Sequence, residues 1–167
     1  KADQIGMLAT VMNCIYTSEI FRTVGLETEI FTPFQCGGFS ELFTKDKTME
    51  QLEKGHVVFF AGGTGHPYFS TDTATVLRAV EIEADMILLA KAIDGVYDSD
   101  PKTNANAVRY EQVSIHEVVE KKLSVVDLTA SIMCMENQMS MRVFSLVEEN
   151  SITKAVSGNF NGTTVVA

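Results

Sequence analysis

The chain has 167 residues, of which 46% are hydrophobic and 21% charged, and its formal net charge is −9 at pH 7. This length and hydrophobic content are typical of one globular domain and exclude a disordered chain. The negative charge gives no basic field that could neutralise a nucleic-acid backbone or attract an anionic membrane surface. We therefore expect neither nucleic acid nor a membrane as a partner.

The three cysteines, Cys14, Cys36 and Cys134, lie far apart and show no CxxC spacing. Such a pattern is typical of buried or idle thiols in a reducing cytoplasm, not of a metal or catalytic site. No signal peptide opens the chain, and no apolar run approaches the roughly 20 residues of a membrane helix. We therefore expect a cytoplasmic protein without a protein-held metal site.

The first part of the chain alternates helical and strand patterns. Apolar residues recur every three to five positions from Gly6 until Gly25, which predicts an amphipathic helix. The predicted elements are a helix over residues 6–24, a strand over 27–31, a loop with one helical turn over 35–47, a helix over 49–54 and a strand over 56–61.

The second part continues with the same alternation. Its predicted elements are a helix over residues 72–84, a strand over 86–90, a long loop over 94–108, helices over 114–122 and 127–137, a strand over 141–145, a helix over 151–156 and a strand over 163–167. The succession of strand, helix and strand over residues 56–90 is typical of a βαβ unit in a parallel sheet. Because no repeat or linker interrupts the chain, we predict a single α/β domain over residues 1–167.

Three glycines, Gly62, Gly63 and Gly65, lie between a predicted strand and a helix N-terminus. Free backbone N–H groups and the helix dipole favour an anion such as phosphate at that position. Neither the Walker pattern nor the dinucleotide fingerprint is present. The plainer interpretation is that these glycines only allow the strand and the helix to pack closely.

A polar cluster follows the glycines and favours a binding site over packing alone. Hydroxyl, imidazole and carboxylate groups alternate with proline and aromatic residues over positions 64–73, a composition typical of a small pocket. Ser70 or Thr71 is expected to cap the following helix. Residues 56–77 contain no Lys or Arg, so a phosphoryl group bound here would need Mg²⁺ or cations from elsewhere.

Five stretches of the sequence carry a family resemblance: "GMLATVMN" (6–13), "AGGTGHPYFSTDTA" (61–74), "EIEAD" (81–85), "DGVYDSDP" (94–101) and "VVDLTA" (125–130). In order and spacing they resemble the bacterial uridylate (UMP) kinases of the amino acid kinase family over nearly the whole chain. The DGVYxxDP pattern is shared with related kinases of glutamate and aspartate. The first two stretches together are close to diagnostic for the UMP-specific branch.

The resemblance implies a three-layer αβα sandwich around a mainly parallel sheet. It implies transfer of a phosphoryl group from ATP to UMP, giving UDP and ADP with the help of Mg²⁺, as a step of pyrimidine nucleotide biosynthesis. It also implies a homohexamer built from dimers that is inhibited by UTP and responds to GTP. The predicted helix over residues 6–24 resembles the helix that forms the dimer in this family.

The resemblance also implies roles for individual residues. Two residues match the family's active-site acids, Asp72 at a helix start and Asp127 in a further acidic motif. Three match positions on the ATP side: Lys91, Tyr97 and Asp100. The residues that match UMP-binding positions are Asp3, Gly6, Thr64, Gly65, His66, Pro67, Tyr68, Phe69, Ser70 and Thr71.

Simpler structural interpretations exist for four of these residues. Asp72 would stabilise a helix start by roughly 0.3 to 1 kcal/mol as an ordinary carboxylate. Tyr97 fits a core position, and Asp100 before a proline fits turn chemistry. Asp3 at the start of a chain fits a solvated side chain.

The sequence departs from the family pattern at several positions. His66 replaces the Asn of the common GTGNP loop, which adds a group that titrates near neutrality. The family has a basic stretch before the position of Asp94, and here this stretch retains a single cation, Lys91. Arginines often found around the GTP-responsive interface of the family are absent near Ser18, Glu29 and His56, so we do not expect GTP activation by default.

The largest departure concerns the family's KxSGE strand and GGGN loop, which cradle the ATP phosphates. These motifs precede the family segment with which this chain begins, and Lys1 stands in place of an initiator methionine. We therefore expect a chain that lacks the N-terminal ATP-phosphate-binding segment and that is inactive as 167 residues alone.

Two alternatives remain open. One is a related kinase that phosphorylates a carboxylate or a carbamate, although the loop lacks the cationic partners that a carboxylate would require. The other is a non-catalytic nucleotide-binding or storage protein on the same fold, as the molybdenum storage protein illustrates.

Overall fold

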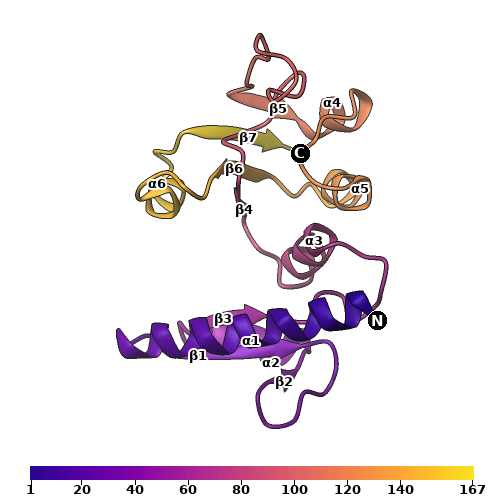
Figure 1. Cartoon of the computed structure of the whole chain (residues 1–167). Coiled ribbons are helices and arrows are strands. Elements are labelled where there is room, and N and C mark those ends of the chain that lie inside the picture. Colours follow the sequence, from indigo (N-terminus) through magenta and orange to yellow (C-terminus); the bar gives the residue numbers. More distant parts are fainter. The chain divides into compact units, whose positions relative to one another are not determined.

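The computed structural model describes all 167 residues, which form two compact units, Lys1–Ile82 and Glu83–Ala167 (Figure 1). Each unit contains its own β-sheet. Compactness alone does not decide how many domains fold independently, so the single-domain organisation stays a prediction. None of the helices combines the length and the apolar composition needed to cross a bilayer.

The first unit is built on a three-stranded parallel sheet with the strand order β2-β1-β3. Helix α1 lies along β1 and β3 (Figure 1). In chain order the elements are α1 (Ala2–Thr23), β1 (Thr28–Thr32), β2 (Glu41–Leu42), α2 (Lys45–Glu53), β3 (Val57–Phe60) and α3 (Thr71–Glu81).

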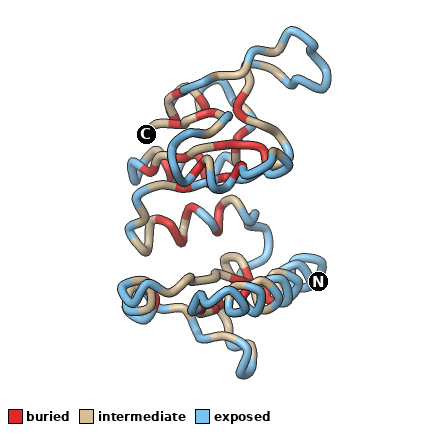
Figure 2. The backbone as a smooth tube through the Cα atoms, turned by 90° about the vertical axis from the view of Figure 1, so that its left-hand side faces the viewer, coloured by how far each residue is buried: buried red, intermediate tan, exposed pale blue.

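Helix α1 contacts its own sheet with one side only. Val11 forms a buried cluster with Ile30 of β1 and Ala61, which follows β3. The opposite side carries exposed apolar residues, and the helix is largely pale blue in Figure 2. This exposed apolar row consists of Ile5, Leu8, Met12, Tyr16 and Ile20. The local core therefore accounts for only part of the apolar sequence of α1.

The second unit is built on a four-stranded sheet with the strand order β4-β6-β7-β5. Strands β6 and β7 pair antiparallel, and the other two pairs are parallel. Its elements are β4 (Ile87–Lys91), β5 (Gln112–Ser114), α4 (Ile115–Glu120), α5 (Leu128–Glu136), β6 (Met141–Ser145), α6 (Ser151–Ser157) and β7 (Gly162–Val166). The core includes Met141 and Val143 of β6, Val165 of β7 and Cys134 of α5, all essentially inaccessible to solvent.

The prediction that the strands around residues 56–61 and 86–90 share one sheet is wrong in this structure. β3 pairs with β1 in the first sheet, and β4 pairs with β6 in the second. Helix α3 therefore does not cross over between strands of one sheet, although it lies between two strands in sequence. Strands β2 and β5 were not predicted, because two or three residues are too few to establish an alternating pattern.

Helix starts differ from the predictions for a chemical reason. Ser114 and Asp127 were predicted as first helical residues, but each is the N-cap of the helix that follows, α4 or α5. Each side chain accepts a hydrogen bond from the backbone N–H three residues later, as an N-cap does. Ser70 caps α3 in the same way, so the expected cap is confirmed at Ser70 and not at Thr71.

The long loop after β4 is closed at its base by a buried threonine of β7. Thr163 Oγ1 accepts a hydrogen bond from Val96 N at 2.9 Å and donates one to Tyr110 O at 2.5 Å. Tyr110 N also donates to Val96 O, so the two ends of the loop lie side by side. A Cβ atom on Gly95 would lie 2.6 Å from this hydroxyl, which explains the glycine. The base of the loop is therefore fixed although its middle is exposed.

We expect Cys134 to be inert in the folded protein, because burial raises the pKa of its thiol to about 11 and solvent does not reach it. With Ellman's reagent at pH 8, the number of fast-reacting thiols should be the same in wild type and Cys134→Ala. Cys36→Ala is the matched control, because Cys36 is only half-buried and its loss should lower that number. A fast-reacting thiol that disappears in Cys134→Ala would contradict the prediction.

We expect Thr163→Val to lower the free energy of unfolding by about 1–3 kcal/mol, because a buried N–H and a carbonyl lose their partner. Amide hydrogen exchange at Val96 should accelerate, whereas Thr163→Ser should retain both properties. Thr164→Val is the control, since the neighbouring side chain of a strand points to the opposite face. Urea unfolding that shifts equally in Thr163→Val and Thr164→Val would refute the role of this hydroxyl.

Candidate functional site

The glycine turn at residues 62–65 is fixed to helix α1 by one hydrogen bond. Gly62 N donates to Thr10 Oγ1 at 2.7 Å, and Gly65 N closes the turn on Gly62 O at 3.1 Å. Gly62 is buried, and both glycines have φ near +80°. This left-handed conformation favours glycine.

Close packing explains two of the three glycines. A Cβ atom on Gly62 would lie 2.8 Å from the Phe34 ring, and one on Gly65 would lie 3.0 Å from the Pro33 ring. A Cβ on Gly63 would meet nothing within 4 Å. The packing interpretation therefore holds for Gly62 and Gly65, while Gly63 is next to open space.

Thr64 and His66 hold the middle of the loop through contacts with each other. The Thr64 hydroxyl accepts from His66 N and donates to His66 O, both at 3.2 Å. His66 Nδ1 lies 3.2 Å from Thr64 O, a contact in which the carbonyl can only accept. The His66 side chain itself is exposed. Its imidazole is therefore oriented by the loop's own backbone.

Asp3, in the first turn of α1, holds the far end of the loop. Its Oδ2 accepts a hydrogen bond from Tyr68 N at 2.9 Å, across 65 residues of sequence. Tyr68 has φ of +71°, an uncommon conformation for a non-glycine residue. Asp3 is therefore not merely a solvated side chain, because it stabilises the backbone at the point where the loop turns.

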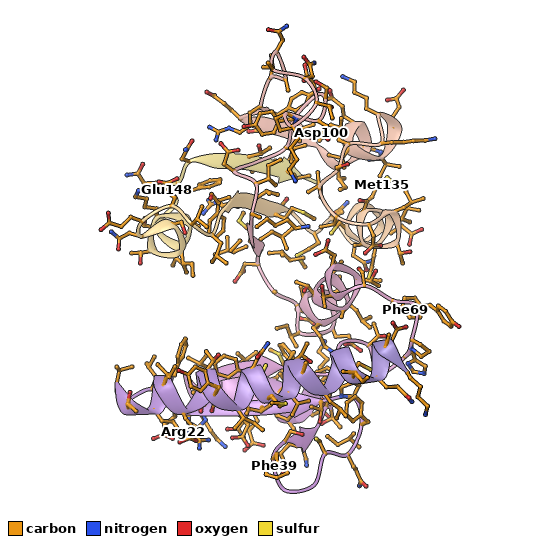
Figure 3. The ribbon with its side chains drawn as sticks, in the orientation of Figure 1. Arg22, Phe39, Phe69, Asp100, Met135 and Glu148 are labelled. Atoms are coloured by element: carbon orange, nitrogen blue, oxygen red, sulfur yellow. The ribbon has the colours of Figure 1, made fainter.

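The two aromatic residues of the loop are turned outward. The Tyr68 side chain is 96% exposed and that of Phe69 is 55% exposed. Figure 3 shows Phe69 extending away from the ribbon. Exposed aromatic rings next to polar loop groups are suited to contact a planar ligand.

Asp72 lies in the first turn of α3, directly after the loop, and is half-buried. Thr71 is exposed beside it, and Ser70 is occupied as the helix cap. Arg78 of the same helix lies 3.9 Å over the Phe43 ring and pairs with Glu81. The loop therefore offers hydrogen-bonding groups, and Asp3 and Asp72 in the adjoining helices offer carboxylates, while the arginine of α3 is engaged in packing.

Gly6, predicted to bind UMP, lies in α1 one turn after Asp3. A Cβ atom there would meet nothing within 4 Å, so packing in this structure does not require a glycine. Pro67 lies in the exposed part of the loop. The first unit thus brings together the predicted UMP-binding residues at two places, the start of α1 and the loop before α3.

The remaining predicted residues lie in the second unit. Lys91, at the end of β4, donates from Nζ to Val125 O at 2.6 Å. Val125 is two residues before Asp127, whose carboxylate caps α5. Asp100 lies in the exposed loop and accepts from Lys102 N at 2.9 Å, as its interpretation as a turn residue requires (Figure 3).

Tyr97 is part of a polar cluster and not of the core. Its hydroxyl donates to Asp94 Oδ1 at 2.8 Å, and this hydrogen bond to a carboxylate raises the pKa of Tyr97 above its usual value. Asp94 in turn pairs with Arg109 at 2.6 Å, and Arg109 donates to Asn161 Oδ1. The cluster orients the Tyr97 ring at the base of the loop.

Sequence reasoning missed Thr10, Pro33, Asp94 and Arg109 as residues that shape these places. For Thr10 a signal existed, because residues seven apart in a helix lie on the same face and Asp3 had been selected. For Pro33 and Arg109 the contacts are formed across 15 residues or more and no local pattern marks them. Asp94 begins the DGVYDSDP motif and contacts Tyr97 three residues later, so that motif was a signal for it.

The structure contains no group of three or more His, Cys, Asp or Glu side chains arranged to hold a metal ion. Mg²⁺ in phosphoryl-transfer enzymes is held by one or two carboxylates together with substrate phosphates and water. The residues present therefore do not form a ready-made protein cage for the ion.

Comparison with known proteins agrees with these motifs. The model of the amino acid kinase family matches residues 1–145. Crystal structures of a UMP kinase from Ureaplasma parvum and one from Bacillus anthracis superpose with TM-scores of 0.94 at 34% and 30% identity. The alignments cover 99% of this chain and 71% and 68% of theirs. A uridylate kinase from Archaeoglobus fulgidus matches with a TM-score of 0.71 and 29% identity, over 98% of this chain and 71% of its own.

These matches confirm the predicted α/β fold class with mainly parallel sheets. The family match spans most of the chain and includes both segments of the first unit that meet at the glycine turn. The chain therefore belongs to the amino acid kinase family, and this family together with the UMP kinase structures supports a phosphotransferase.

Proposed function

We propose that the protein transfers the γ-phosphoryl group of ATP to UMP, giving UDP and ADP. The observation that carries this proposal is the contact between two sequence segments that are most specific for UMP kinases. Asp3 bonds to Tyr68 N and Thr10 bonds to Gly62 N, so the start of α1 and the loop before α3 form one surface. The structures with TM-scores of 0.94 are UMP kinases, which supports the same assignment.

In this proposal the loop reads UMP through hydroxyl and backbone groups that are already held in place. Thr64 and His66 are locked by their mutual hydrogen bonds, and the rings of Tyr68 and Phe69 are available to contact the base. Asp3 uses one carboxylate oxygen for Tyr68 N and offers the other to a ribose hydroxyl. A preorganised site of this kind rejects cytosine, because a wrong donor or acceptor leaves a buried group unpaired.

ATP is assigned to the second unit, at Lys91, Tyr97 and Asp100. Phosphoryl transfer requires positive charge near the equatorial oxygens of the transferred group. Because residues 56–77 contain no Lys or Arg, this charge is assigned to Lys91 and to the Mg²⁺ that ATP brings. Mg²⁺ supplies neutralisation of phosphate charge, and Asp72 and Asp127 are proposed to act on the reacting groups.

The proposal includes a homohexamer built from dimers in the cytoplasm, working in pyrimidine nucleotide biosynthesis, with inhibition by UTP. It includes an effect of GTP but not activation by GTP, because the arginines of the family's GTP-responsive interface are absent near Ser18, Glu29 and His56. The exposed apolar row of α1 supports self-association, because monomeric proteins seldom leave such a continuous apolar stripe in water. A related kinase acting on a carboxylate is less well supported, since residues 56–77 offer no Lys or Arg to such a ligand.

The first test is the choice of phosphoryl acceptor. The full-length gene product with Mg-ATP should release ADP with UMP, with kcat/KM at least about 100-fold lower for CMP and no turnover with glutamate or carbamate. A coupled ADP assay and direct detection of UDP measure this. Turnover with glutamate or carbamate would establish the alternative kinase. Tight UMP binding by calorimetry without turnover would establish the non-catalytic binding protein.

The second test concerns Asp72. Asp72→Asn should lower kcat for UMP by about 100-fold or more. The reason is that the active site loses a carboxylate that is proposed to act on the reacting groups. Asp46→Asn is the matched control, since Asp46 also lies in the first turn of a helix of the first unit, α2, and matches no active-site position of the family.

Circular dichroism and thermal unfolding should show both variants folded, with similar small losses of helix stabilisation. Unchanged kcat in folded Asp72→Asn, or an equal loss of kcat in Asp46→Asn, would overturn the catalytic assignment of Asp72.

A further inference from the structure

Thr10 makes two hydrogen bonds whose directions determine each other. Its Oγ1 donates to Met7 O at 2.6 Å within α1 and accepts from Gly62 N at 2.7 Å. A hydroxyl has one proton and two lone pairs. Because the proton is used by the Met7 carbonyl, the oxygen is held facing the glycine turn as an acceptor.

The amide that Thr10 accepts from has few alternatives. Gly62 is buried, and its Cα faces the rings of Phe34 and Pro33 at close range. A buried backbone N–H without an acceptor is strongly unfavourable. Gly62 O at the same time accepts from Gly65 N, so the orientation of this one residue sets the turn up to Gly65.

Helix α1 therefore holds the loop at two points. Thr10 fixes the start of the loop at Gly62, and Asp3 fixes its end at Tyr68. The two side chains are seven residues apart, which places them on one face of the helix two turns from each other. A rigid helix thus sets the distance between the two ends of the loop.

We propose that Thr10 is a positioning residue for the nucleotide loop, acting through Gly62 and not on the ligand. The inference rests on the proposed function in one respect, that the loop binds UMP. Thr10 then determines UMP affinity by fixing the loop in its binding conformation before UMP arrives, which lowers the cost of ordering the loop on binding.

The variants that test this are Thr10→Val and Thr10→Ser in the full-length gene product. Valine has nearly the shape of threonine without the hydroxyl, and serine keeps the hydroxyl. Thr17→Val is the matched control, because the Thr17 hydroxyl donates to Asn13 O within α1 at 2.8 Å. This control removes a similar helix bond without touching the loop. Thr10→Ala serves as a second hydroxyl-free variant if Thr10→Val does not fold.

Each variant is tested by two independent measurements, hydrogen exchange and steady-state kinetics. Without any ligand, hydrogen exchange of peptides spanning residues 61–69 should accelerate about tenfold in Thr10→Val and remain unchanged in Thr10→Ser and Thr17→Val. In steady-state kinetics, KM for UMP should rise about tenfold in Thr10→Val, with KM for ATP unchanged. The Thr10→Ser variant should have the wild-type KM for UMP.

Unchanged hydrogen exchange over residues 61–69 in Thr10→Val would overturn the positioning role, whatever the kinetics show. Equal effects in Thr17→Val, or equal rises of both KM values, would overturn it as well, because they indicate general loss of helix stability. Faster loop exchange in Thr10→Val together with a wild type that does not use UMP would support the positioning role and overturn the proposed function instead.

Discussion

The buried amide of Gly62 is the constraint on which the candidate site of the first unit depends. A chain that turns at glycine immediately after a strand must find an acceptor for this N–H, and here a neighbouring helix supplies it. An apolar contact next to this hydrogen bond brings the helix and the turn together. Val11, adjacent to Thr10, packs in one cluster with Ala61, adjacent to Gly62. Hydrophobic packing thus sets the position of the helix, and the hydrogen bond sets the orientation of the turn.

The second unit uses a hydroxyl in the same way. Thr163 is fully buried in β7, and its oxygen meets the backbone at both ends of the loop that carries Tyr97 and Asp100. In both units a threonine on a regular element fixes the base of an irregular segment. The segments themselves keep exposed side chains, as Tyr68 and Asp100 illustrate. Rigid attachment at the base combined with exposure at the tip is suited to ligand binding.

Sequence reasoning recovered what is encoded locally. The strand Met141–Ser145 was predicted with its observed bounds, because it is a short run rich in apolar residues. Helix α3 was predicted to within three residues, because a capping residue precedes its periodic pattern. Strand pairing was not recovered, because no residue pattern near Phe59 or Leu88 indicates which strand will pair with β3 or β4.

For the site, residue types and family motifs identified the loop and Asp3. The contacts that shape the loop join positions 52 and 65 residues apart and could not be read from either segment alone. The structure also assigned structural contacts to residues predicted for function. Asp127 caps a helix and Asp100 closes a turn. The sequence motifs alone did not distinguish these structural roles from a role in binding.

The strand order of the second unit has a consequence for how this part of the chain folds during synthesis. β7 is the last strand of the sequence, yet it lies between β6 and β5, and β5 has no other strand partner. Its threonine also closes the loop that begins 67 residues earlier. Until residues 162–166 are in place, β5 and the base of that loop have no strand to pair with. The sheet of this unit is therefore completed by a long-range step that joins β7 to strands from earlier in the sequence, and one edge of β6 stays open until then.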